Sequence, residues 1–289
     1  MALPVIRGLK TEREKFAGAL RTYTIEAMMQ DRKALQTGTS HNLGQNFARA
    51  FEVDFLDSDG ERKLVWATSW GVSTRLIGAL IMAHSDDRGL ILPPALAPVE
   101  VVIVPIYRSD DEKGRVLEVA SALKKELSSS YTVVLDDREQ FKPGYKFSEW
   151  ELKGVPVRLE LGPRDVESGQ VVLVRRDNGL KSFHPAAATQ DKVKETLVAI
   201  HKAMYDKALE FREANTKKID SYEEFKEYMA ADRGFALVHW AGSREDEERI
   251  QDETKATIRC IPLDAELEEG RCFLTGRPSK MRVVAGKAY

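Results

Sequence analysis

The segment Val99-Glu100-Val101-Val102-Ile103-Val104-Pro105-Ile106 sets the fold class for the middle of the chain. Six of its eight residues are Val or Ile, and polar residues do not alternate with them. Such a run is typical of a strand that is buried on both faces of a sheet. A helical pattern follows at residues 111–127 and ends at Ser128-Ser129-Ser130. A buried strand followed by a helix predicts a small α/β domain.

The pattern continues toward the C-terminus. Further strands are expected at residues 131–135, 155–161 and 170–175, and their alternation with helical segments predicts a mixed sheet. Beyond them, apolar residues recur close to the helical period and predict a long amphipathic helix, whose apolar stripe we interpret as a packing surface. These residues are Val193, Leu197, Ile200, Met204 and Phe211.

The stretch 89–98 contains three prolines and predicts a domain boundary. We therefore expect one domain at residues 1–98 and a second at 99–182. The remaining residues, 183–289, are expected to form a linker helix and a C-terminal domain.

Composition limits the possible functions. The 289 residues, 43% of them hydrophobic, can form two or three domains. A formal charge of -2 gives no overall attraction to nucleic acid or an anionic membrane, so any RNA contact must be local. No apolar stretch approaches the roughly 20 residues of a membrane span, and residues 1–7 do not resemble a secretion signal. We expect a cytoplasmic protein that does not bind membranes. Its two cysteines are too few for a disulfide framework.

The densest polar segment is Leu35-Gln36-Thr37-Gly38-Thr39-Ser40-His41-Asn42-Leu43-Gly44-Gln45-Asn46-Phe47. It can present several hydrogen-bond donors and acceptors to a small polar ligand, although such a loop is by itself more often a turn. Two further segments change that interpretation. They are Thr68-Ser69-Trp70-Gly71-Val72-Ser73-Thr74-Arg75-Leu76-Ile77-Gly78 and Asp86-Asp87-Arg88-Gly89-Leu90-Ile91-Leu92-Pro93-Pro94.

Together these segments resemble the proline-pocket loop and the motif 3 strand and helix of class II prolyl-tRNA synthetases. Residues 8–19 match another stretch of that family's catalytic domain, and residues 135–138 and 143–156 are typical of its anticodon-binding domain. The resemblance continues to Lys287-Ala288-Tyr289 and covers essentially the whole chain. It implies a multidomain α/β and α+β protein: a partial, antiparallel class II catalytic domain, an α/β anticodon-binding domain and a small α+β C-terminal domain.

The resemblance also implies a proline–tRNA ligase, which joins proline to its tRNA through prolyl-adenylate and uses ATP with Mg²⁺. In this reading Arg75 is the catalytic cation, because a guanidinium stays charged and pairs with phosphate oxygens. Without the resemblance, Arg75 would be read as a solvated arginine and Trp70 as a core aromatic residue. The implied contacts are His41 and Trp70 with proline, and Gln36, Thr39, Ser73 and Arg75 with ATP, Gln36 also lying near magnesium.

The chain departs from the family pattern upstream. Full-length members have motif 1, which builds a homodimer interface, and motif 2, which grips the ATP α-phosphate; neither is found in these residues. We therefore expect the isolated chain not to form prolyl-adenylate, and a homodimer is not assumed for it. The alternative function is a synthetase-like module that binds tRNA or a partner without activating proline.

The C-terminal region predicts the type of synthetase and its metal content. A C-terminal extension, with no editing insertion in the stretch available, indicates the archaeal/eukaryal type. Many relatives bind a structural zinc there through four cysteines. Here only Cys272 remains, whereas Ala241, Asp246 and Thr275 occupy the other ligand positions and Cys260 lies outside the set. We therefore expect no zinc site.

Residues 136–160 interleave five basic with four aromatic side chains, a mixture that suits unstacked RNA bases. Acidic residues outnumber the basic ones there, so attraction to phosphate is not the argument. The resemblance is what favours an anticodon contact. Arg138 and Lys146 are the leading candidates.

Overall fold

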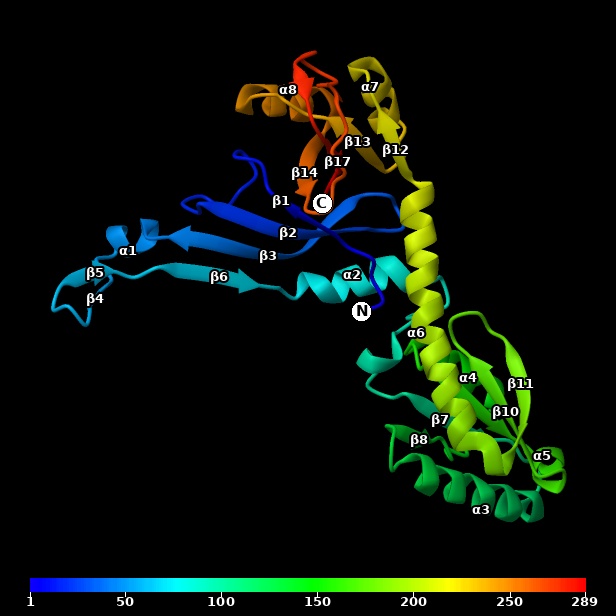
Figure 1. Cartoon of the computed structure of the whole chain (residues 1–289). Helices are drawn as coiled ribbons and strands as arrows, with labels where there is room; N and C mark the ends of the chain where they lie inside the picture. The colour runs from blue at the N-terminus through cyan, green and yellow to red at the C-terminus, as the bar shows by residue number, and fades with distance from the viewer. The chain divides into compact units, whose positions relative to one another are not determined.

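The computed structural model describes residues 1–289, which form two compact units. Unit 1 contains Met1–Leu3 and Leu80–Ala208, and unit 2 contains Pro4–Ala79 and Leu209–Tyr289. The chain passes between the units after Leu3 and again within helices α2 (Arg75–His84) and α6 (Thr189–Ala214), which are labelled in Figure 1. None of the helices is both long and apolar enough to cross a membrane.

Unit 2 is built on an eight-stranded sheet with the order β12-β13-β17-β14-β1-β2-β3-β6. Only the β12–β13 pair is parallel. The expected antiparallel sheet is therefore confirmed, and the β1–β14 pair makes it continuous with the C-terminal strands. Its strands are β1 (Ile6–Leu9), β2 (Arg21–Met28), β3 (Ala34–Gly44), β6 (Ala67–Gly71), β12 (Thr216–Ile219), β13 (Phe235–His239), β14 (Ala256–Pro262) and β17 (Arg282–Lys287).

The β1–β14 pair requires close approach of the two backbones. A Cβ atom on Gly8 would lie 2.4 Å from the Cβ of Cys260, so only glycine fits at this position. Burial raises the pKa of the Cys260 thiol to about 12, so the thiol stays protonated and acts as a small packing group.

A buried ion cluster joins the same strands. The carboxylate of Glu26 in β2 is fully buried and accepts hydrogen bonds from the Thr24 hydroxyl at 2.8 Å and from Lys10 Nζ at 2.9 Å. Its other oxygen accepts two bonds from the Arg259 guanidinium, at 3.1 and 3.0 Å. Lys10 Nζ also donates to the Arg259 carbonyl at 2.8 Å. Both carboxylate oxygens are thus satisfied, as a buried charge requires.

The C-terminal part of unit 2 has the expected α+β character. Helices α7 (Tyr222–Ala230) and α8 (Arg244–Thr254) begin after Ser221 and Ser243, whose hydroxyls accept from backbone N–H groups of the first turn. Asp246, one of the positions expected to replace a zinc ligand, completes the capping box of α8, where its carboxylate accepts from the Ser243 N–H at 2.8 Å. Short elements complete the unit: α1 (Asn46–Ala50), β4 (Asp54–Leu56), β5 (Arg62–Leu64), β15 (Gly270–Arg271) and β16 (Pro278–Ser279).

Unit 1 contains the expected mixed sheet, with the order β11-β10-β9-β7-β8. Strand β7 pairs in parallel with β8 and β9 and is buried along its whole length, as its sequence predicted. β11 was not predicted, because Lys-Ser-Phe-His-Pro lacks an apolar run. The bounds are β7 (Val101–Pro105), β8 (Val133–Leu135), β9 (Val157–Leu161), β10 (Gln170–Arg175) and β11 (Lys181–Pro185), with helices α3 (Asp110–Leu127), α4 (Pro143–Leu152) and α5 (Pro163–Glu167) and the 3₁₀ turns η1 (Pro94–Leu96) and η2 (Ala186–Ala188).

The predicted helix at residues 111–127 and the predicted long amphipathic helix are both confirmed. α3 begins at the N-cap Ser109, carries three acidic residues in its first turn and buries its apolar stripe against the sheet. α6 buries Val193, Leu197, Ile200 and Met204 in the same core, whereas Phe211 packs in unit 2. The apolar stripe of α6 is therefore a packing surface.

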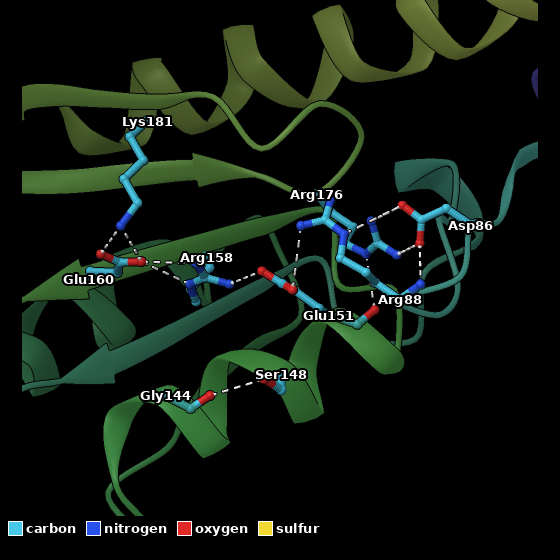
Figure 2. A network of polar contacts seen from close by, with 9 residues as sticks. All are labelled: Asp86, Arg88, Gly144, Ser148, Glu151, Arg158, Glu160, Arg176 and Lys181. Carbon is cyan, nitrogen blue, oxygen red and sulfur yellow. Dashed lines mark hydrogen bonds and ion pairs between the residues drawn. The ribbon is translucent and has the colours of Figure 1, made fainter.

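The segment that follows α2 is fixed to the sheet of unit 1 by polar contacts (Figure 2). The guanidinium of Arg176 donates to both Asp86 oxygens, at 3.0 and 2.6 Å, and to the Glu151 carbonyl at 3.0 Å. Gly89 has φ +132°, and a Cβ there would lie 2.4 Å from Leu152 Cα, so the backbones meet where only glycine fits. Figure 2 shows the network continuing across β9 through Arg158 and Glu160.

The ion cluster of unit 2 should dominate the stability of the β1–β14 junction. Arg259→Ala leaves the buried Glu26 carboxylate with one cation, and we expect a loss of about 3–5 kcal/mol in unfolding free energy. Arg244→Ala is the matched control, because its pair with Glu248 is exposed and should contribute about 1 kcal/mol or less. Urea denaturation measures the loss, and amide exchange should place it in β1 and β14. Equal effects of the two substitutions would contradict this prediction.

The Asp86–Arg176 pair should make stability depend on pH. Hydrogen bonds from Arg176 lower the pKa of Asp86 from 3.8 to about 2. A depressed carboxyl pKa stabilises the folded state above about pH 3.8, and this contribution is lost as the pH falls toward 2. Asp86→Asn should therefore lower the melting temperature at pH 7, with the difference from wild type shrinking below pH 4. Asp111→Asn, which removes the exposed ion pair between Asp111 and Arg115, serves as the control. A difference that is constant with pH would show that the ion pair is not its cause.

Candidate functional site

The register of β2, β3 and β6 decides which of the predicted site residues share a face of the sheet. Residues paired across antiparallel strands lie on the same face, and successive residues along a strand lie on opposite faces. His41 and Thr39 therefore lie on one face and Trp70 on the other. The cross-strand rows are Thr22–His41–Ser69, Tyr23–Ser40–Trp70 and Thr24–Thr39–Gly71.

A β-bulge brings Gln36 to the face of His41. Gln36 and Thr39 are three residues apart, and in a regular strand they would lie on opposite faces. The register shifts here, however, because Ile25 pairs with Gly38 and Glu26 pairs with Gln36, which leaves one extra residue, Thr37, in β3. Glu26 shares the face of Thr24, whose hydroxyl it binds. The structure thus brings Gln36, Thr39 and His41 together on one polar face.

The His41 imidazole is oriented from two sides. Its Nδ1 lies 3.0 Å from the Thr22 hydroxyl oxygen. The ring of Phe16, from the loop between β1 and β2, lies 4.8 Å from it between centroids, and Phe16 is itself next to the ring of Phe47. His41 remains partly exposed, so a ligand can reach it from the remaining side.

The opposite face of the sheet carries an open, mainly apolar cavity of about 520 Å³. Trp70 lines it with Tyr23, Ile25, Val72 and Leu263. The Trp70 side chain is 79% exposed, so its reading as a core aromatic residue is wrong. The structure does not place Trp70 on the same face as His41.

Arg75 is the first residue of α2, and Ser73 lies in the turn between β6 and this helix. Both are exposed, and the Arg75 N–H lies 3.4 Å from the Ser73 hydroxyl. The Arg75 guanidinium makes no ion pair in the structure. A free cation at a helix N-terminus suits phosphate, because the helix dipole and the exposed N–H groups of the first turn both favour an anion there.

The loop that carries Phe16 is fixed to α8 of the C-terminal region. The Thr11 hydroxyl donates to Glu247 Oε2 at 2.9 Å. Burial raises the pKa of Glu247 to about 7, although the bond from Thr11 lowers it. Thr11, Phe16, Thr22 and Glu247 received no role from the sequence. In the sequence, only the family match of residues 8–19 indicated a role for this region. Glu247, the partner of Thr11 in α8, lies more than 200 residues away along the chain.

The two anticodon candidates lie around one buried carboxylate in unit 1. Burial raises the pKa of Asp136, but hydrogen bonds from Arg138 and Trp150 outweigh it and lower this pKa to about 2. Arg138 makes two bonds of 2.8 Å to this carboxylate, and its side chain is 34% exposed. Lys146 is only 3% exposed, and its Nζ donates to the Asp136 carbonyl at 2.9 Å. This burial does not fit the expected direct contact of Lys146 with RNA: its ammonium supports the Asp136 turn.

Exposed aromatic rings lie next to Arg138. Tyr145 is 54% exposed and stacks on Phe141, with ring centroids 4.5 Å apart and planes at 17°. The Arg138 guanidinium lies 4.9 Å from the Phe141 centroid. A flat cation and an exposed ring are the groups on which nucleic-acid bases stack.

Three family models match successive parts of the chain. The model "tRNA synthetase class II core domain (G, H, P, S and T)" matches residues 3–84, and "Anticodon binding domain" matches residues 100–196. The model "Prolyl-tRNA synthetase, C-terminal" matches residues 222–289.

Curated relatives match along the entire chain. The proline–tRNA ligase of Chloroflexus aggregans is 55% identical over 292 residues, and that of Roseiflexus sp. is 54% identical over the same length. The proline–tRNA ligase of Porphyromonas gingivalis is 54% identical over 290 residues. The matches cover all of this chain but 59–60% of each relative, so the chain spans about three fifths of their length. In the order of its three family matches and over its full length, the chain is therefore similar to the C-terminal portion of class II prolyl-tRNA synthetases.

Proposed function

We propose that this chain forms part of a proline–tRNA ligase, in which proline and ATP give prolyl-adenylate and the prolyl group then passes to tRNA. The observation that carries the proposal is the polar face of β3. There Gln36, Thr39 and His41 lie together. Arg75, the first residue of α2, follows Ser73 by two residues, and its guanidinium is free.

Each of these residues has a role in the proposal. His41 contacts proline, whereas Thr39, Ser73 and Gln36 contact ATP. Arg75 stabilises the negative charge of the phosphates as the proline carboxylate attacks the α-phosphate, with pyrophosphate as the leaving group. Trp70 is proposed for the proline pocket on its motif and its exposed ring alone, because the register places it on the other face from His41.

The polar face of β3 also contains a side chain suited to bind magnesium. The Gln36 side-chain oxygen is a neutral ligand of the kind that Mg²⁺ accepts beside substrate phosphates and water. The carboxylate of Glu26, which pairs with Gln36 across β2 and β3, is already bound by Lys10 and Arg259 and is not free for a metal. We propose that Gln36 is the contribution of this chain to a magnesium ion that enters with ATP, where the ion would neutralise phosphate charge.

We also propose how the chain is organised. A partial catalytic domain occupies residues 1–98, the anticodon-binding domain 99–182, and the linker helix and C-terminal domain 183–289. The protein is of the archaeal/eukaryal type and cytoplasmic. It binds no zinc, and Cys272 instead packs in an apolar cluster with Phe273 and Phe225.

The second candidate function, tRNA binding without proline activation, applies to the isolated chain. Residues 101–204 supply most of an apolar core around β7, α3 and α6 and a second cluster on the other face of β7. Tyr145 is exposed and Arg138 is partly exposed. Motifs 1 and 2 of the family are not found in these residues. We therefore propose that the isolated chain binds tRNA but does not form prolyl-adenylate, and we do not propose a homodimer for it.

Arg75→Ala tests the catalytic assignment in the complete synthetase that contains this chain. Proline-dependent pyrophosphate exchange should fall by about 10²–10³-fold, because one fixed cation is lost from the nucleotide site. Arg277→Ala, which removes another exposed arginine without an ion pair, is the control and should leave exchange unchanged. Near-normal exchange by Arg75→Ala would reassign Arg75 to a structural role, and exchange by the isolated 289-residue chain would refute its proposed inactivity.

Titration of the 289-residue chain with a proline tRNA and an unrelated tRNA, at several salt concentrations, tests the anticodon surface. Arg138→Ala should reduce discrimination between the two RNAs by about 1–3 kcal/mol, because it removes the proposed base contact. Lys142→Ala removes an exposed lysine without an ion pair and should weaken both RNAs alike. Melting temperatures of both variants check that the Asp136 cluster stays folded. Equal affinity of the wild type for both RNAs would rule out anticodon reading.

A further inference from the structure

The hydroxyl of Thr22 holds a position that determines the chemistry of His41. The Thr22 side chain is buried, with a residue exposure of 2%. Its oxygen has two partners: the backbone N–H of Phe16 at 3.0 Å and Nδ1 of His41 at 3.0 Å. The same Phe16 places its ring against the imidazole, 4.8 Å between centroids.

These two contacts fix the direction of the hydrogen bond. A backbone N–H can only donate, so the Thr22 oxygen accepts from Phe16. If Nδ1 of His41 also donated to this oxygen, the Thr22 proton would be left buried without an acceptor, at a cost of about 1–3 kcal/mol. The bond is satisfied at both ends only when the Thr22 O–H donates to an unprotonated Nδ1. In neutral histidine the proton must then be on Nε2.

A rotation of the imidazole by 180° would not satisfy the hydroxyl either. It would place a ring carbon against the Thr22 oxygen and again leave the hydroxyl proton without an acceptor. The Phe16 ring also packs against the imidazole and restricts its rotation. Nε2 of His41 has no hydrogen-bond partner in the protein, and its N–H is therefore available to a ligand.

We propose that Thr22 is a positioning residue that fixes His41 as the Nε2–H tautomer, so that the site presents a hydrogen-bond donor to an oxygen of its ligand. The assignment of that oxygen to the proline carboxylate rests on the proposed function. The tautomer itself depends only on the contacts of Thr22, Phe16 and His41.

Long-range ¹⁵N–¹H NMR correlation of the histidine-labelled 289-residue chain at pH 8.5 tests the tautomer without substrate. That pH is chosen about two units above the ordinary histidine pKa. His41→Gln identifies the His41 signals by their loss. Wild type should show the Nε2–H pattern, Thr22→Ser should keep it, and Thr22→Val should give a mixture of tautomers. Ser69→Ala is the matched control, because Ser69 neighbours His41 on β6 but makes no hydrogen bond to it, and should leave the wild-type pattern.

An Nδ1–H pattern in wild type overturns the proposal, even if Thr22→Val fails to fold. An unchanged Nε2–H pattern in folded Thr22→Val overturns the role of Thr22. In the complete synthetase, Thr22→Val should raise KM for proline about tenfold, the effect of one misplaced hydrogen bond, with a smaller change in kcat, and Thr22→Ser should restore it. An unchanged KM together with an altered tautomer overturns the assignment of proline as the ligand and leaves the tautomer in place.

Discussion

The buried carboxylate of Glu26, held between Lys10 and Arg259, is the interaction on which the rest of unit 2 depends. The β1–β14 ladder contains only two residue pairs, Gly8 with Pro262 and Leu9 with Ile261. A buried charge is tolerated only when its partners are present, so the cluster makes separation of these strands costly. One sheet therefore runs from the C-terminal strands to the candidate site, and the geometry of β2 and β3 depends on residues more than 200 positions away in sequence.

The same arrangement links the C-terminal region to the candidate site. α8 contacts the loop of residues 10–20 through the hydrogen bond from Thr11 to Glu247. The same loop places the Phe16 ring against the His41 imidazole. The His41 imidazole thus takes its orientation from β2, from the loop and, through the loop, from α8. The C-terminal region contributes no candidate site residue, but it helps to orient the His41 imidazole through this loop.

Sequence patterns predicted the parts of the fold that depend on local periodicity. β7, β10, α3 and α6 were predicted because apolar residues recur there at strand or helix spacing, whereas β11 lacks that signal. Family motifs supplied the site residues, but their placement needed the structure. The parity of strand positions alone would put Gln36 and Thr39 on opposite faces, and it does put Trp70 opposite His41. Lys146 stands among aromatic residues in the sequence, as a base-contacting lysine would, and only the fold shows its ammonium bound inside to Asp136.

The extra residue at Thr37 has a consequence for how this segment can change. Because the bulge, and not the identity of any one side chain, turns Gln36 toward His41, the segment from residue 36 to residue 41 is constrained in its backbone path more than in its composition. Thr37 could be replaced by another residue and the count would be kept. If Thr37 instead entered the regular ladder, every functional group would remain in the chain and the amide of Gln36 would still turn to the other side of the sheet. In this segment the position of the bulge therefore matters as much as the side chains that it orients.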